Sequence, residues 1–93
     1  MENIEIAIAN KIVDFCEGEC TFIQSTCKQW QSATFKGLKI SVTFEYSNDP
    51  CLDKMYEYLE SIDRIKNYLL CDFCIDIQAG NIVQFEFVLL DDV

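Results

Sequence analysis

LKISVTFEY (residues 38–46) alternates apolar and polar side chains without a break. The apolar residues occupy every second position from Leu38 to Tyr46, and polar residues fill the positions between them, from Lys39 to Glu45. A period of two is typical of a β-strand that buries one face and exposes the other. The stretch therefore predicts a sheet with one face on a hydrophobic core and one face in solvent.

The residues before this strand predict a hairpin and a helix. Residues 30–35 can form a partner strand, with Lys36-Gly37 as the reversal, while residues 21–29 fit either an additional edge strand or a loop. From Glu2 to Glu17 the apolar residues fall at helical spacing, and Gly18 follows as a stop. The apolar stripe is wide, which favours packing of this helix against a sheet.

The residues after the strand predict a second helix and a second hairpin. Asp49 and Pro50 suit the cap and the first turn of a helix, and apolar residues continue at helical spacing from Leu52 to Leu69. Residues 71–78 and 83–89 then alternate as two strands that reverse at residues 79–81. The predicted fold is α+β: residues 1–93 form a single compact domain, an antiparallel sheet of about four strands with two helices packed on one face, in the order α-β-β-α-β-β.

Composition argues against catalysis. The 93 residues are 51% hydrophobic and contain sixteen acidic and seven basic residues, no histidine and a net charge of -9. The apolar content is too high for a disordered acidic tail. Without histidine, a general base would have to be a perturbed carboxylate, lysine or cysteine, and no neighbouring residues indicate one. We therefore expect a protein that is not an enzyme and has no catalytic residues.

Six cysteines raise the question of metal or redox chemistry. Residues 1–5 lack the basic start and apolar run of an export signal, so we expect a cytoplasmic protein with free thiols. Zinc bound by Cys16, Cys20, Cys71 and Cys74 is an alternative, although neither pair has the glycine that shapes a zinc knuckle. A redox role for Cys71 and Cys74 is less favoured, because strand alternation follows them. We expect no metal and no cofactor.

The acidic residues are the candidate partner-binding groups. On the open face of the predicted sheet they are Asp72, Asp76 and Glu86, with Glu45 possible beside them. A competing face on the second helix carries Asp53, Glu57 and Glu60, and Trp30 is a candidate aromatic anchor. Like charges that lie close together favour a partner that neutralises them, and a generic soluble surface is the alternative explanation. We expect a basic protein partner, and no direct binding to nucleic acid or to a membrane, since both are anionic.

In overall profile the chain resembles the small acidic immunity proteins that bacteria make against their own nuclease toxins, including those of contact-dependent inhibition systems. The resemblance rests on size, acidity and the lack of catalytic groups. It implies a cytoplasmic inhibitor that binds a basic toxin domain and blocks its active site. The alternatives are a phage-type anti-CRISPR or nucleic-acid mimic, an acidic subunit of a larger complex, and a small-ligand or metal-binding module that uses the cysteines.

Overall fold

Strand β2 (Lys36–Tyr46) lies where the alternation of residues 38–46 predicted a strand. The computed structural model describes residues 3–48 and 52–91, and its elements within these ranges follow the order α1 (Asn3–Cys16), β1 (Cys20–Gln31), β2, α2 (Leu52–Glu60), β3 (Arg64–Ile65), β4 (Tyr68–Ala79) and β5 (Ile82–Asp91). The strands form one antiparallel sheet in the order β1-β2-β5-β4-β3. The predicted α+β class is confirmed, with five strands instead of about four.

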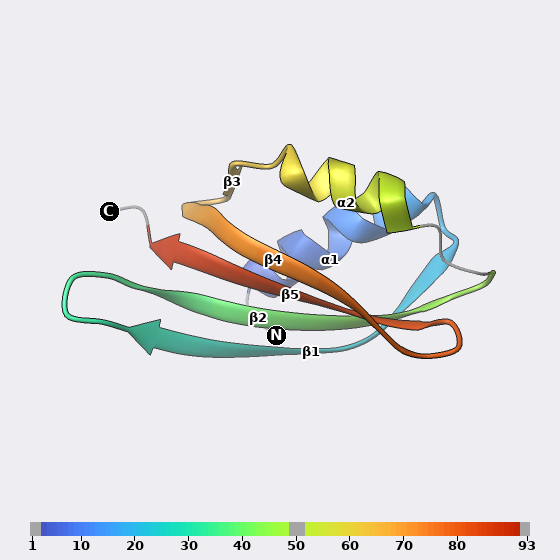
Figure 1. Cartoon of the computed structure of the whole chain (residues 1–93), viewed down its shortest axis with the longest axis horizontal. Coiled ribbons are helices and arrows are strands. Elements are labelled where there is room, and N and C mark those ends of the chain that lie inside the picture. The colour runs from blue at the N-terminus through green and yellow to red at the C-terminus, as the bar shows by residue number, and fades with distance from the viewer. Residues whose placement is uncertain (1–2, 49–51, 92–93) are drawn as a thin grey trace.

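Both helices lie on the same side of the sheet, and its other face is uncovered (Figure 1). Helix α1 contacts β1, where the Ser25 hydroxyl donates a 2.9 Å hydrogen bond to the buried Glu5 carboxylate. Helix α2 contacts β4 through the rings of Tyr56 and Phe73, whose centroids are 5.1 Å apart. One apolar core lies between the helices and the sheet, and Phe44 at its centre is 0% exposed.

The second helix is shorter than predicted. It ends at Glu60, and the Ser61 hydroxyl and backbone N–H both donate to the Tyr58 carbonyl. Ile65 is buried all the same, at 2% exposed, because the two-residue strand β3 pairs with the start of β4. The apolar residues with helical spacing therefore lie in a turn and in the short strand β3, and they reach the core from there. Strand β3 is the fifth strand of the sheet. The predicted cap, Asp49 and Pro50, lies outside the described residues.

The first hairpin turns earlier than predicted. Residues 20–31 are all strand, which resolves the ambiguous segment, and the reversal lies at residues 32–35, where Ser32 and Phe35 exchange backbone and side-chain hydrogen bonds. Gly37, expected in the turn, lies inside β2. A Cβ atom there would overlap the backbone carbonyl of Leu89 on β5, so this glycine permits close approach of two strands instead of a reversal.

The C-terminal hairpin reverses at Gly80, which has a φ of 57°, within the segment predicted to turn. Its first strand contains a bulge at Cys71, between Leu70 and Asp72. No helix in residues 3–48 or 52–91 combines the length and the apolar character that crossing a bilayer requires.

Candidate functional site

The uncovered face of the sheet carries an ordered array of polar side chains. Strand register aligns three rows across β1, β2, β5 and β4: Gln24, Thr43, Gln84 and Asp76; Thr26, Ser41, Glu86 and Cys74; and Lys28, Lys39, Val88 and Asp72. Because side chains alternate between the faces of a strand, all of these residues point away from the helices. The array includes three of the predicted partner-binding carboxylates.

Asp72, Asp76 and Glu86 surround the thiol of Cys74, and we call these three residues the acidic triangle. Asp72 and Asp76 lie two positions before and after Cys74 on β4, and Glu86 lies directly opposite it on β5. The Cys74 thiol donates a 3.7 Å hydrogen bond to Glu86 Oε2. Burial, followed by the negative charges of Glu86, Asp72 and Asp76, raises the pKa of Cys74. The structure therefore brings these predicted site residues together.

A hydrogen-bond network orients one corner of the acidic triangle. The Gln78 amide donates to Asp76 Oδ2 at 2.7 Å and to Gln84 Oε1 at 2.9 Å. The Gln84 amide in turn donates to the Ser41 hydroxyl on β2. The network crosses three strands and holds the Asp76 carboxylate in place before any partner arrives. In the sequence, the only indication of this network is that Ser41 and Gln84 lie at the polar positions of alternating strands.

Glu45, expected beside these carboxylates, is separated from them. It pairs with Ile82, four positions along β2 from Ser41, which lies opposite Glu86. At about 3.3 Å per residue, Glu45 is displaced along the sheet by about 13 Å from the row that contains Glu86. It is not part of the acidic triangle.

Trp30 lies on the same open face, one row beyond Lys28 and Lys39. It is aligned with Gly37, Leu90 and Leu69, so this row is apolar from β1 to β4. We call Trp30, Leu69, Val88 and Leu90 the apolar end of the face. The indole N–H of Trp30 is buried and has no hydrogen-bond acceptor among the described residues.

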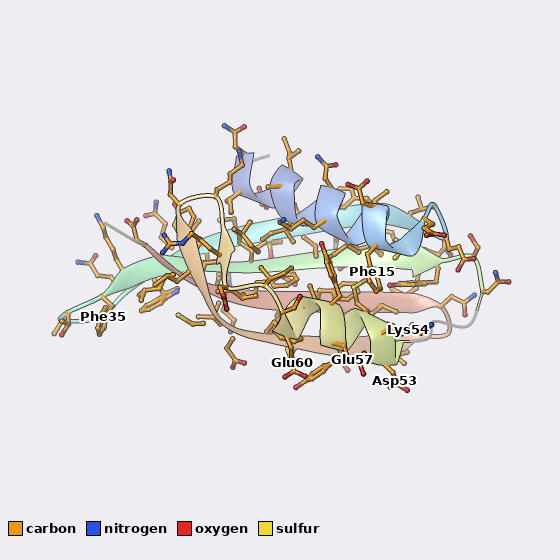
Figure 2. All side chains as sticks on the ribbon, turned by 90° about the horizontal axis from the view of Figure 1, so that it is seen from above. Phe15, Phe35, Asp53, Lys54, Glu57 and Glu60 are labelled. Carbon is orange, nitrogen blue, oxygen red and sulfur yellow. The ribbon has the colours of Figure 1, made fainter. Side chains whose placement is uncertain are left out.

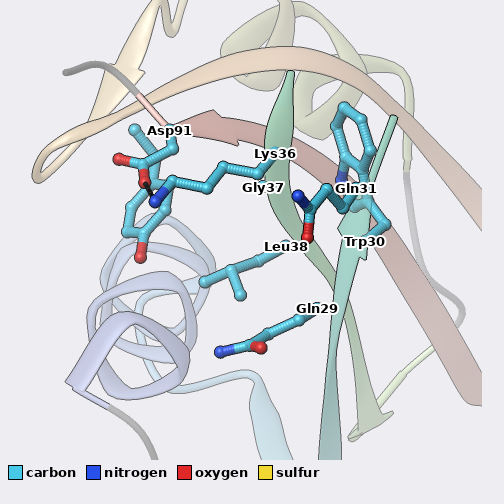
Figure 3. A pocket seen from close by; sticks show the side chains of 8 residues that line it. Gln29, Trp30, Gln31, Lys36, Gly37, Leu38 and Asp91 are labelled. Atoms are coloured by element: carbon cyan, nitrogen blue, oxygen red, sulfur yellow. Dashed lines mark ion pairs between the residues drawn. The ribbon is translucent and has the colours of Figure 1, made fainter. Parts of the chain in front are cut away.

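A groove of about 490 Å³ borders the apolar end. Lys36 and Asp91 cross it as an ion pair with an Nζ–Oδ2 distance of 3.8 Å, and Trp30 lies beyond Gln31 from this pair (Figure 3). Both charged side chains remain partly exposed, so their attraction contributes little to stability. Lys36 and Asp91 adjoin Gly37 and Leu90 of the open face, so the paired charge lies on the helix side of the sheet, at the end that carries Trp30.

The open face is divided in charge. All sixteen acidic residues lie outside residues 20–44, whereas Lys28, Lys36 and Lys39 lie within that hairpin. Lys28 faces Lys39 across β1 and β2, and both line a depression of about 250 Å³ whose other wall includes Glu86. Residues 20–44 of β1 and β2 therefore form a basic half, and β4 and β5 form an acidic half.

The second acidic group lies on α2. Asp53, Glu57 and Glu60 are exposed along the outer side of the helix, directed away from α1 (Figure 2). We call them the helix row. Since Tyr56 of α2 contacts Phe73 of β4, and Asp72 adjoins Phe73 on the opposite face, the helix row and the acidic triangle lie on the two sides of one strand.

The cysteine pairs do not form one site. Within the described parts of the chain, no three histidine, cysteine or acidic side chains are grouped as metal ligands, and Cys51 lies outside those parts. Cys16 donates to the Tyr46 hydroxyl at 3.4 Å, and burial together with Cys16 raises the pKa of Cys20 to about 12. The buried Cys20 thiol, with its raised pKa, is therefore a poor nucleophile at neutral pH.

Comparison with known proteins adds no relative: no protein-family model, no curated protein and no solved structure matches the chain.

Proposed function

We propose that this chain is a non-catalytic acidic inhibitor that binds and neutralises a basic nuclease toxin, as an immunity protein does. The observation that carries the proposal is the acidic triangle on the uncovered face of the sheet. Three carboxylates that surround one thiol repel one another, and this repulsion is relieved when a cationic group docks between them. The toxin would be recognised in the cytoplasm, without contact to nucleic acid or membrane.

The chemistry of the toxin fits this surface. A nuclease must be basic around the cleft that holds the phosphate backbone, so carboxylates presented there compete directly with the substrate. Asp76 already accepts a hydrogen bond from Gln78, which also donates to Gln84, and this lowers the entropy lost when a lysine or arginine pairs with Asp76. Opposite charges also steer the two proteins together, toward association rates of roughly 10^8 to 10^9 per molar per second at low salt.

The apolar end offers a partner hydrophobic surface, which the carboxylates do not. Protein interfaces place large rings in a desolvated centre with polar groups around it. Trp30 and Leu90 lie on the same face as the acidic triangle. A partner that covers both regions would combine hydrophobic burial with charge pairing.

A nucleic-acid mimic, such as a phage-type anti-CRISPR, is the second candidate, and the helix row favours it. Asp53, Glu57 and Glu60 are three or four residues apart on α2, so their Cβ atoms are about 5–6 Å apart. A regular row of negative charges resembles a phosphate backbone. A mimic would depend on the helix row alone, whereas an immunity protein of the kind proposed would require the acidic triangle.

The test compares two triple charge reversals in cells that express a basic nuclease toxin encoded beside this gene. One variant carries Asp72→Lys, Asp76→Lys and Glu86→Lys; the control carries Asp14→Lys, Glu17→Lys and Glu19→Lys, which changes the net charge equally at exposed positions. We expect the first to lose protection and to bind the toxin at least about a hundredfold more weakly, because close interfacial charge pairs are worth several kcal/mol. Equal effects of the two variants would refute an acidic-triangle site.

A further inference from the structure

The outer edge of β4 is unpaired over most of its length. Strand β3 pairs only with Tyr68 and Leu69, and the Leu70 N–H donates to the Asp63 carbonyl at 3.0 Å. Beyond Leu70, no strand in residues 3–48 or 52–91 pairs with this side of β4. The open edge of a sheet is a template for another strand.

Which backbone groups face outward follows from one hydrogen bond. The Phe73 N–H donates to the carboxylate of its neighbour Asp72 at 2.9 Å, so it points away from β5. Outward N–H groups recur at every second residue of a strand, which places those of Ile75 and Ile77 on the same edge. The side chain of Ile77 is 53% exposed, and an added strand would cover it.

Carboxylates lie on both sides of this edge. On the helix side, Asp53 and Glu57 extend outward over β4, and Tyr56 beside them is 49% exposed (Figure 2). On the open side are Asp72 and Asp76. Side chains of an added strand alternate between these two sides, so basic residues on either face of that strand would meet negative charge.

We propose that the outer edge of β4, from Phe73 to Ile77, binds an extended basic segment of a partner protein by strand addition. The proposal rests on the proposed function, since it states how a basic partner is held. Backbone hydrogen bonds supply the register and the carboxylates supply the choice of partner. A second copy of this chain is disfavoured there, because its β4 edge would bring the same negative charges.

The opposite edge of the sheet provides the contrast. Strand β1 is equally long, but it contains no acidic residue, and its only charged residue is Lys28. A basic segment would gain no charge pairing on β1 itself. The two edges therefore offer similar backbone hydrogen-bonding groups, but only the β4 edge offers carboxylates, so a basic strand would bind at β4.

The test uses a peptide of alternating lysine and valine, about eight residues long, as the probe, with NMR detection of each backbone amide. We expect hydrogen exchange at Ile75 and Ile77 to slow by about tenfold on binding, because new backbone hydrogen bonds form there. A peptide with glutamate in place of lysine should not bind. Perturbation of β1 alone, or unchanged exchange at Ile75 and Ile77, would overturn the proposal.

A matched pair of variants tests the same edge by another route. Ile75→Pro removes the outward N–H, a change that edge strands tolerate, while Ile75→Ala removes the same side chain and keeps the N–H. We expect the proline variant to bind the peptide about tenfold more weakly than the alanine variant. If the proline variant binds equally well while the acidic-triangle reversal still abolishes toxin protection, strand addition is wrong and the proposed function stands. If the peptide protects Ile75 and Ile77 and the proline variant binds it more weakly, but the acidic-triangle reversal leaves toxin protection unchanged, strand addition stands and the proposed function is wrong.

Discussion

Replacing Gly37 with alanine should destabilise the protein strongly, although only one methyl group is added. The new Cβ would overlap the backbone carbonyl of Leu89 and would lie 3.1 Å from Cε2 of Trp30. The overlap is with backbone, so it is relieved only if the central strands β2 and β5 move apart. Overpacking of this kind costs roughly 1–3 kcal/mol, and each weakened ladder hydrogen bond adds about 1 kcal/mol.

We therefore expect Gly37→Ala to lower the free energy of unfolding by about 3 kcal/mol. A domain of this size has a total stability of roughly 5–10 kcal/mol, so the loss is a large fraction of it. In a thermal melt it corresponds to a fall in Tm of roughly 12–24 °C. Urea unfolding followed by far-UV circular dichroism measures the change without relying on the fluorescence of Trp30, whose environment is itself altered.

Gly80→Ala is the matched control. Gly80 has a φ of 57°, but a Cβ there would meet no atom within 4 Å. This variant should therefore cost about 1–2 kcal/mol, from left-handed backbone strain alone. If Gly37→Ala proves no more destabilising than Gly80→Ala, the close approach of β2 and β5 at Gly37 is not as described.

Two further predictions concern groups with raised pKa values. Burial raises the pKa of Cys20 from 9.0 to about 12, and it also raises the pKa of Tyr46. Above about pH 9 the folded protein therefore keeps protons that the unfolded chain releases. The free energy of unfolding should fall as the pH rises through this range, by at most about 1.4 kcal/mol per pH unit for each group. Urea titrations across this range should show a flatter pH dependence in Tyr46→Phe, and an identical slope would contradict the burial of that hydroxyl. Alkylation of Cys74 by iodoacetamide at about pH 8.5 requires the thiolate, so it should accelerate in Glu86→Gln and stay unchanged in Glu45→Gln. Equal rates in the two variants would count against the acidic triangle.

Local periodicity was sufficient to predict part of the site. The strict alternation of β2 and of the last two strands placed Asp72, Asp76 and Glu86 on one face, because the side to which a strand residue points depends only on its position along that strand. The end of α2 was not predictable in the same way. Ile62, Ile65 and Leu69 fit a helical period, but pairing of β3 with β4, a contact between short segments, decided their structure.

The relation between the two acidic groups required the tertiary structure. The sequence presented the helix row and the carboxylates of β4 and β5 as competing surfaces. Their arrangement around one strand depends on the order β1-β2-β5-β4-β3 and on the placement of α2 over β4. The same order places Lys39 on the neighbour of β5, so a basic half adjoins the acidic half, which no local pattern indicated.

On the open face of the sheet, Lys28 and Lys39 lie on the first hairpin, whereas Asp72, Asp76 and Glu86 lie on β4 and β5, so the two halves of this face carry charges of opposite sign. In the electric field of a cationic surface, a protein with charges divided in this way is subject to a torque before the two surfaces touch. It rotates so that β4 and β5 face the cationic surface and the lysine-bearing hairpin faces away from it. Orientation is thereby selected during approach, at separations of up to about the Debye length of 8–10 Å. Moving charge from one half to the other, at constant net charge, would leave the attraction in place and remove the alignment.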